Sequence, residues 1–306
     1  MGDWLKNKVA IVTGSGQGIG RAIALAMAKE GAMVVTSNRQ PRSSGGDAQT
    51  TADEITSMEG QALPFFGDIS SFDVAKKLVQ TAVEHFGRLD ILVNNAIVYV
   101  SRPIWEMTEE DWDNCLDTGL KGAFNCTRHA CVVMKEQKWG RILNATSRTR
   151  LGGFEFSNYG AAKAGIEGFS RSVARDVGRF GITCNAFSPS AATRWTTAEA
   201  RLARHKRSYE AGIITRQQYE KRLNTPPPPP ETIPPLLVYL STDLAADING
   251  QVFRIEGDRI ANHSEPEEKN AIYKKEALWT VEELRDLIPG VVLNGYTNPA
   301  PPQPNS

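Results

Sequence analysis

The sequence predicts an α/β protein in which helices cover both faces of a parallel sheet. Three observations support this fold class: short apolar runs rich in β-branched residues recur along the chain, segments with apolar residues at helical spacing separate them, and a glycine-rich turn follows the first run. Two neighbouring parallel strands need a crossover connection, which is normally a helix. We therefore expect a Rossmann-type doubly wound parallel sheet, in a single domain with a C-terminal extension.

The apolar runs place the strands, and the periodic segments place the helices between them. After the first run, Ile23, Met27 and Ala28 recur at helical spacing, and after the third run Val74 and Leu78 do the same. The expected strands are Val9–Val12, Met33–Thr36, Ala62–Phe66, Ile91–Val93, Arg141–Ala145, Thr183–Phe187 and Gln251–Glu256.

The second half of the chain departs from this alternation. We expect residues 1–259 to form the Rossmann domain, within which residues 195–230 form a lid and a proline-rich linker. The lid is one predicted helix, Ala198–Leu223, crowded with Arg, Lys and Glu, and it runs into Pro226–Pro230. Five consecutive prolines fit neither a helix interior nor a central strand, so they predict a rigid extended spacer. A helix over Thr232–Leu240 then leads back to the sheet.

Residues 260–306 are expected to be a C-terminal extension that lies over the cleft of its own or a neighbouring subunit. Its one helix signal is Thr280 as N-cap with Glu283 three residues later, followed by apolar residues. The last nine residues, from Asn298 to Ser306, are rich in proline and are expected to be disordered or to lie along the surface.

Composition and charge exclude several classes of protein. The chain has 35 Lys and Arg against 35 Asp and Glu, so it lacks the overall positive charge that nucleic-acid binding usually needs. Cys115, Cys126, Cys131 and Cys184 form no CxxC pair, which predicts reduced thiols, no metal site and a cytoplasmic protein. The N-terminus lacks a secretion signal, and no apolar run reaches the roughly 18 residues of a membrane span.

A glycine-rich turn, Thr13-Gly-Ser-Gly-Gln-Gly-Ile-Gly20, stands between the first strand and the first helix. Glycines at 14, 18 and 20 allow a tight turn, close approach of the backbone to a pyrophosphate and close packing of the helix, whose N-terminus attracts negative charge. The position of the turn favours a nucleotide site over an ordinary tight loop.

A second group of residues has the chemistry of proton transfer. Tyr159 and Lys163 are one helical turn apart, so both lie on one face of a helix, and an ammonium beside a phenol favours the phenolate. Ser147 follows the end of a strand, where its hydroxyl can bind the oxygen of an interconverting carbonyl and alcohol. The alternative is a surface YxxxK pattern on an amphipathic helix.

Taken together, these motifs resemble the short-chain dehydrogenase/reductase family over residues 6–258, closest to its bacterial 3-hydroxyacyl-CoA dehydrogenase branch, near the dehydrogenase domains of peroxisomal multifunctional enzymes. Asn94-Asn95-Ala96 is similar to the NNA motif of that family, and Pro189 with Thr193 to its nicotinamide-side loop. The resemblance implies that Tyr159 transfers the proton, that Lys163 holds the nicotinamide ribose and lowers the pKa of the tyrosine, and that Ser147 orients the substrate oxygen. It implies cofactor contacts at Gly14, Ser15, Gln17, Gly18, Ile19, Gly20, Asn38, Arg39, Asp68, Ile69, Asn95, Ala96, Tyr159, Lys163, Pro189 and Thr193.

The expected cofactor is NADP in preference to NAD. NAD-specific relatives usually carry an acidic residue at the end of the second strand, where this chain has Asn38 and Arg39. A carboxylate that would repel the 2′-phosphate is missing there, and Arg39 could pair with that phosphate. The alternative is that Arg39 stacks on the adenine of NAD.

Three residues depart from the family pattern near the presumed site. Ile97 replaces the glycine of NNAG, Gly119 replaces an asparagine that joins the proton relay, and Ser190 replaces a glycine after Pro189. We expect Gly119→Asn to leave activity equal or higher. Ser147 is also one residue nearer to Tyr159 than usual, and the usual spacing would select Thr146 instead; the preceding strand favours Ser147.

The resemblance implies an NAD(P)-dependent oxidoreductase that interconverts a secondary alcohol and a ketone, with a 3-hydroxyacyl-CoA thioester as the suggested substrate. The departures support the alternative of a catalytically impaired subunit that pairs with an active homologue. We expect a small-molecule substrate, no nucleic acid and no membrane, and a homodimer or homotetramer, with a hetero-oligomer as the alternative. Arg148 and Arg150 are either a clamp for a carboxylate or phosphate of the substrate, or a solvated turn.

Overall fold

The computed structural model describes residues 2–43, 45–275 and 278–299. In these residues eight strands form one sheet in the order β3-β2-β1-β4-β5-β6-β7-β8, which is parallel except for the antiparallel pair β7 and β8. The predicted doubly wound sheet is therefore confirmed. The strands are β1 (Val9–Thr13), β2 (Met33–Asn38), β3 (Ala62–Phe66), β4 (Ile91–Asn94), β5 (Gly140–Ala145), β6 (Ile182–Ser190), β7 (Val252–Glu256) and β8 (Arg259–Asn262).

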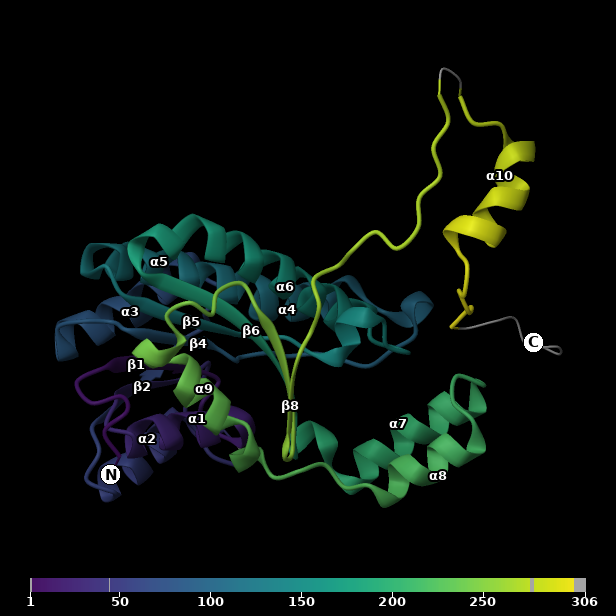
Figure 1. Ribbon diagram of the computed structural model, residues 1–306. Coiled ribbons are helices and arrows are strands. Elements are labelled where there is room, and N and C mark those ends of the chain that lie inside the picture. The colour runs from purple at the N-terminus through teal and green to yellow at the C-terminus, as the bar shows by residue number, and fades with distance from the viewer. Residues whose placement is uncertain (1, 44, 276–277, 300–306) are drawn as a thin grey trace.

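Helices cover both faces of the sheet (Figure 1). On one face α1, α2 and α9 pack with a buried cluster that includes Ile23, Ile55 and Leu237, and on the other α3, α5 and α6 pack with a cluster that includes Leu78 and Met134. The bounds of these helices, and of α4, which precedes α5 in the chain, are α1 (Gly18–Lys29), α2 (Ala48–Ser57), α3 (Phe72–Phe86), α4 (Glu109–Leu116), α5 (Gly122–Gln137), α6 (Ser157–Val177) and α9 (Pro234–Leu240).

The direction in which successive strands are added to the sheet reverses between β1 and β4. From β1 the sheet continues through β2 on one side, and from β4 it continues through β5 on the other side. In open α/β sheets a crevice opens at this switch point, beyond the carboxyl ends of the strands. The turns that follow β1, β4, β5 and β6 meet there, so the fold brings segments far apart in the sequence to one place.

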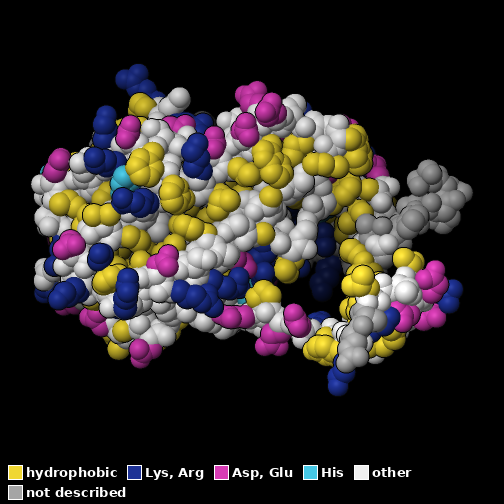
Figure 2. Space-filling model, turned by 90° about the horizontal axis from the view of Figure 1, so that it is seen from above, with side chains coloured by type: hydrophobic (Ala, Val, Ile, Leu, Met, Phe, Trp, Pro, Cys, Tyr) yellow, Lys and Arg dark blue, Asp and Glu magenta, His cyan; other side chains and the backbone are white. Residues whose placement is uncertain are grey.

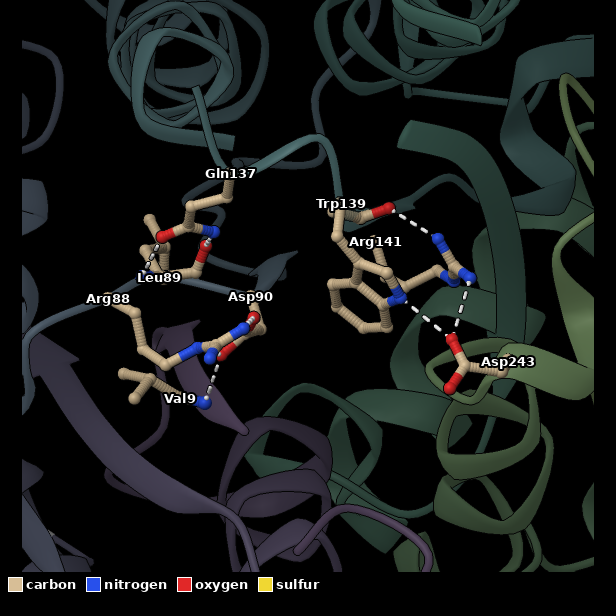
Figure 3. A network of polar contacts seen from close by, with 9 residues as sticks. Val9, Arg88, Leu89, Asp90, Gln137, Trp139, Arg141 and Asp243 are labelled. Atoms are coloured by element: carbon tan, nitrogen blue, oxygen red, sulfur yellow. Dashed lines mark hydrogen bonds and ion pairs between the residues drawn. The ribbon is translucent and has the colours of Figure 1, made fainter. Parts of the chain in front are cut away.

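A network of polar contacts ties together the opposite, amino-terminal ends of the strands (Figure 3). The buried carboxylate of Asp90 accepts hydrogen bonds from the Val9 backbone at 2.9 Å and from Arg88 at 2.6 and 2.7 Å. Arg141, only 2% exposed, donates to the carbonyl oxygens of Gly181 and Thr242. Since each of these buried polar groups has a partner, the network holds the strands together at the end away from the crevice.

The lid differs from the single helix predicted for residues 198–223. It consists of α7 (Ala198–Glu210) and α8 (Arg216–Asn224), two helices that pack against each other. The break has a local cause: Gly212 adopts a left-handed φ of 68°, and Thr215 starts α8 with a capping box. The proline run lacks regular structure up to Pro229, and Pro230 begins a short 3₁₀ turn.

The C-terminal region differs from expectation in two ways. The strand β8 crosses the expected border between residues 259 and 260, so the sheet extends to Asn262. Beyond β8 the chain runs away from the sheet to α10 (Val281–Leu287), for which the predicted Thr280 cap and Glu283 partner are confirmed (Figure 1). None of the described residues that line the crevice lies beyond Glu256, so the described part of the extension does not cover the cleft of its own chain. Of the tail predicted to be disordered, residues 300–306 lie outside the described residues.

The predicted reduced thiols are consistent with the structure, because all four cysteines are free. Burial raises the pKa of the Cys115 thiol, and that of Cys131, to about 11. Within the described residues, no helix is both long enough and apolar enough to span a membrane.

Candidate active site

The glycine-rich turn joins β1 to α1 in a conformation that side chains would disturb. Gly18 has a left-handed φ of 56° at the first position of α1. A Cβ atom at Gly20 would collide with the backbone carbonyl of Gly14. The turn is therefore a bare backbone surface in front of a helix N-terminus, which is the arrangement that suits a pyrophosphate.

The segment after β4 is tied to this turn by backbone and side-chain contacts. Thr13 Oγ1 accepts hydrogen bonds from the backbone N–H groups of Asn95 at 3.0 Å and Ala96 at 3.1 Å. The side chain of Asn95 donates to the carbonyl oxygens of Thr13 and Gly14. Asn94 has a structural part, because its amide donates to Asn144 and Thr127 across the buried side of the sheet.

Three side chains from β5 and α6 meet at the bottom of the crevice. Lys163 is 2% exposed, and its Nζ donates to the carbonyl of Ala145 at 2.6 Å and lies 5.7 Å from the centre of the Tyr159 ring. Ser147 lines the same crevice as Tyr159, and its hydroxyl acts on the tyrosine by lowering the tyrosine pKa. The structure thus brings together the three residues that the sequence singled out for proton transfer.

The electrostatics of this group are dominated by burial. Burial raises the pKa of Tyr159, and the hydroxyl of Ser147 offsets only part of that rise. Burial also lowers the pKa of Lys163 to about 8, since the ammonium loses its water. The expected lowering of the tyrosine pKa by Lys163 is therefore not found, because both groups are desolvated and the ammonium is bound to the Ala145 carbonyl.

The usual spacing from Tyr159 made Thr146 the alternative to Ser147 as the catalytic hydroxyl. The structure distinguishes the two residues by the partners of their hydroxyls. Thr146 is 1% exposed and points into α6, where its hydroxyl donates to the carbonyl of Lys163 and to Glu167, both at 3.0 Å. Both residues line the crevice, but Ser147 is only half-buried, and its hydroxyl accepts a hydrogen bond from the backbone N–H of Thr149 at 3.3 Å, which leaves its proton for a substrate. Only Ser147 can reach a substrate held against Tyr159.

Two departures from the family pattern occupy the same space. Gly119 lies in a π-helical turn, Asp117–Lys121, and a Cβ atom there would collide with Cδ1 of Ile97. The larger residue after β4 thus fills the place that a side chain at position 119 would take. An asparagine at position 119 would require the Cδ1 end of Ile97 to move, so the effect of Gly119→Asn on activity stays a prediction, and this geometry changes its expected direction to a loss.

The third departure, Ser190, is accommodated in β6. Its hydroxyl donates to Glu256 of β7 at 3.3 Å, and Pro189 pairs with Ile255 in the same ladder. The serine thus links two strands beside the crevice.

At the end of β2 the side chain of Arg39 crosses the crevice mouth. Its guanidinium lies 3.1 Å from the carboxylate of Asp68 and donates to Thr118 Oγ1 at 3.0 Å. The pair with Asp68 is about two-fifths exposed on both sides, so it is screened and contributes little to stability. A bound anion can therefore compete for Arg39.

The crevice has a volume of about 1530 Å³ and is lined by all predicted site residues except Ser15. Ser15 is fully buried, and its hydroxyl accepts a hydrogen bond from the backbone N–H of Ser37 at 2.8 Å. The structure thus corrects its predicted place: the side chain braces the turn against β2 and does not face a ligand. The bare glycine turn and the length of the crevice fit a nicotinamide dinucleotide, whose phosphates Gly18 and its neighbours would hold.

Sequence reasoning missed two parts of the cleft. Tyr99 stacks on Tyr159, with ring centres 4.4 Å apart, and Phe156 meets the same ring edge-on at 6.0 Å. Basic residues of α7 and α8 form the wall facing them. The aromatic residue three positions after the NNA motif was a signal in the sequence, whereas the basic wall depends on how the lid folds.

The two arginines of the loop after β5 separate. Arg148 lines the crevice, whereas Arg150 turns inward, where its guanidinium lies 2.6 Å from the buried carboxylate of Glu167. Burial raises the pKa of Glu167, and the charge of Arg150 counters that effect. Arg150 thus neutralises an internal carboxylate and cannot be part of a clamp for substrate.

Because the turn that suits a dinucleotide and the group that can move a proton share one cleft, the fold and the site define a dinucleotide-dependent oxidoreductase. The chain belongs to the short chain dehydrogenase family, because the sequence model of that family, described as "short chain dehydrogenase", matches residues 8–206. Members of this family use NAD(P)(H). The structure is also similar to a solved short chain dehydrogenase from Mycobacterium avium, with a TM-score of 0.80, 35% identity, and coverage of 97% of this chain and 98% of that one.

Two curated relatives indicate the branch of the family. The hydroxyacyl-CoA dehydrogenase ChsB1 of Mycobacterium tuberculosis is 34% identical over 92% of this chain and 87% of its own length. The peroxisomal multifunctional enzyme type 2 of Drosophila melanogaster is 40% identical over 62% of this chain, a match that spans 32% of that protein. These similarities give no support to the alternative of an impaired subunit.

Proposed function

We propose that this oxidoreductase interconverts a 3-hydroxyacyl thioester and its 3-oxoacyl counterpart, with coenzyme A as the thiol. The observation that carries the proposal is the cleft itself, in which Ser147 and Tyr159 face a wall of basic residues suited to an anionic carrier. The names of the two curated relatives, a hydroxyacyl-CoA dehydrogenase and a multifunctional enzyme, agree with it.

In the reducing direction the substrate carbonyl oxygen would accept hydrogen bonds from Ser147 and Tyr159. Tyr159 would then donate its proton to that oxygen as negative charge develops on it. Lys163, held by the Ala145 carbonyl, would hold the nicotinamide ribose beside the tyrosine, and Tyr159 would regain its proton from solvent. A bound nicotinamide dinucleotide supplies the hydride to the carbonyl carbon, and accepts it in the reverse reaction.

A substrate panel tests this proposal with the purified protein. Oxidation of NADPH is followed with acetoacetyl-CoA, with a longer 3-oxoacyl-CoA and with cyclic ketones. We expect both thioesters to be reduced with a higher kcat/KM than any cyclic ketone. Reduction of the cyclic ketones alone would contradict the thioester proposal and leave the family assignment intact.

We propose NADP(H) as the preferred cofactor, because the end of β2 offers Arg39 and no carboxylate to the 2′-phosphate. Replacing Arg39 by Asp is expected to reverse the preference by about 1 to 3 kcal/mol, the scale of a charge-assisted contact. Fluorescence titration of NADPH and NADH against both proteins measures this difference. Arg175→Asp on the exposed side of α6 is the matched control. Equal affinities of the unaltered protein for the two cofactors would contradict the preference.

We also propose that copies of this chain associate through α5 and α6 as a homodimer or homotetramer. Phe124 and Val132 of α5 are 44% and 52% exposed, and a Cβ atom at Gly168 of α6 would meet no other atom. Apolar side chains beside small residues suit close helix packing between subunits. Sedimentation velocity is expected to give a mass of at least twice 33.5 kDa. A complex with a homologue remains the alternative to a homo-oligomer.

The cytoplasmic location expected from the cysteine pattern stays a prediction.

A further inference from the structure

The two lid helices separate their charges between two sides. On the outer side the cations have acidic partners: Lys206 lies 3.7 Å from Glu210 and Arg216 lies 2.9 Å from Glu220. The cations of these two helices that line the cleft are Arg201, Arg204, Lys221 and Arg222. Within the described part of the chain, none of these four forms an ion pair with a carboxylate.

These four residues come from both helices and are held near each other. The Arg201 guanidinium donates at 2.6 Å to the backbone carbonyl of Arg222 and at 2.6 Å to that of Thr225, which fixes the start of α7 against the end of α8. Burial lowers the pKa of Arg204, and the charges of Arg201 and Arg222 lower it further. Burial and the same cations lower the pKa of His205 to about 4, so this imidazole is neutral at pH 7. The lid therefore concentrates positive charge without compensating it.

This basic face is next to the reactive tyrosine. Burial raises the pKa of Tyr99 and the charge of Arg204 counters that rise, and the Tyr99 ring stacks on that of Tyr159. Seen from above, the molecule is hollowed on the side of the lid, and basic side chains lie inside the hollow (Figure 2). The two carboxylates that line the cleft already have partners, because Asp68 pairs with Arg39 and Glu256 with Arg254. Positive charges held close together in a cleft attract anions.

We propose that Arg201, Arg204, Lys221 and Arg222 form an anion-binding face of the lid that holds the phosphates of the substrate carrier. This inference rests on the proposed function, which it deepens by naming the part of the substrate that the lid binds. Phosphate and carboxylate share the chemistry of an anionic oxygen, so a carboxylate on the acyl chain is the other possible source. Four cations suit a carrier with several phosphates better than a single carboxylate, and exposed Lys221 and Arg222 lie where a long carrier leaves the cleft.

Three thioesters distinguish the sources of the anion. Acetoacetyl-CoA carries the phosphates, its N-acetylcysteamine analogue carries no charge, and the 3-oxoadipyl thioester of N-acetylcysteamine carries only an acyl carboxylate. The double variant Arg204→Gln/Arg222→Gln is compared with the control Lys206→Gln/Arg216→Gln, which alters the paired outer side of the same helices. NADPH is saturating throughout, so that the dinucleotide site is filled.

The double variant is expected to lower kcat/KM for acetoacetyl-CoA at least tenfold more than for the uncharged analogue, while the control changes this ratio less than twofold. The decrease of kcat/KM for acetoacetyl-CoA with added salt should also become shallower. An equal loss for both esters, or a selective loss only for the carboxylated ester, would overturn the proposal.

Failure of the proposed function gives a different result. If the unaltered protein reduces neither acetoacetyl ester, the thioester reaction is wrong, and calorimetric titration of free coenzyme A in saturating NADP⁺ decides the present inference. Binding that the double variant loses and the control keeps supports the anion-binding face. Absence of binding to the unaltered protein overturns it.

Discussion

Replacing Tyr159 by Phe is expected to lower kcat at least 100-fold, which is roughly 3 kcal/mol of activation barrier, and to leave cofactor affinity nearly unchanged. The hydroxyl lies in the cleft that Ser147 also lines, and it is the group that we propose gives a proton to the substrate oxygen. The phenylalanine ring keeps the stacking with Tyr99, so the shape of the site is retained. Only the transferable proton is removed.

Steady-state turnover and a fluorescence titration of NADPH measure the two parts of this prediction. Tyr209→Phe is the matched control, because Tyr209 is 40% exposed on α7 and stacks on Tyr219 outside the group that would transfer protons. The control is expected to retain full activity. A Tyr159→Phe protein with more than a tenth of the original kcat would show that another group or water transfers the proton.

Gly119→Asn is expected to reduce both stability and turnover, and Ile97→Gly in the same protein is expected to restore much of the loss. The new side chain would overlap Ile97, and overpacking of this kind typically costs about 1 to 3 kcal/mol. Ile97 lies directly after the NNA motif, so displacing it would also disturb the cofactor side of the cleft. Removing the isoleucine side chain makes room for the asparagine.

A double-mutant cycle tests this coupling through the free energy of unfolding in urea and through kcat. The two single variants and the double variant should give a coupling energy of about 1 kcal/mol or more, with the double variant more stable than the sum of the single changes predicts. Additive effects would mean that Ile97 and Gly119 do not compete for one space. The cycle leaves Ser147, Tyr159 and Lys163 unaltered, so the residues proposed for proton transfer stay in place while the packing beside the cofactor side of the cleft changes.

The sequence by itself determined the strands of the parallel sheet and the position of the glycine turn, and it singled out the residues that we propose transfer the proton. Each of these is a local pattern: apolar runs predict buried strands, and Tyr159 with Lys163 one turn later must share a helix face. The direction of parallel strands then places the ends of β1, β4 and β5 at one edge. Local patterns with such geometric consequences can be recognised without a structure.

The tertiary structure decided matters that depend on which segments meet. Only the packing of α6 against β5 shows that Thr146 faces Glu167, and only the approach of the π-helical turn to the end of β4 shows that Ile97 fills the space beside Gly119. Likewise, the fold of the lid turns Arg204 and Arg222 toward the cleft while their neighbours pair outside. These outcomes follow from contacts between residues distant in the chain, whose distances and directions no local spacing contains.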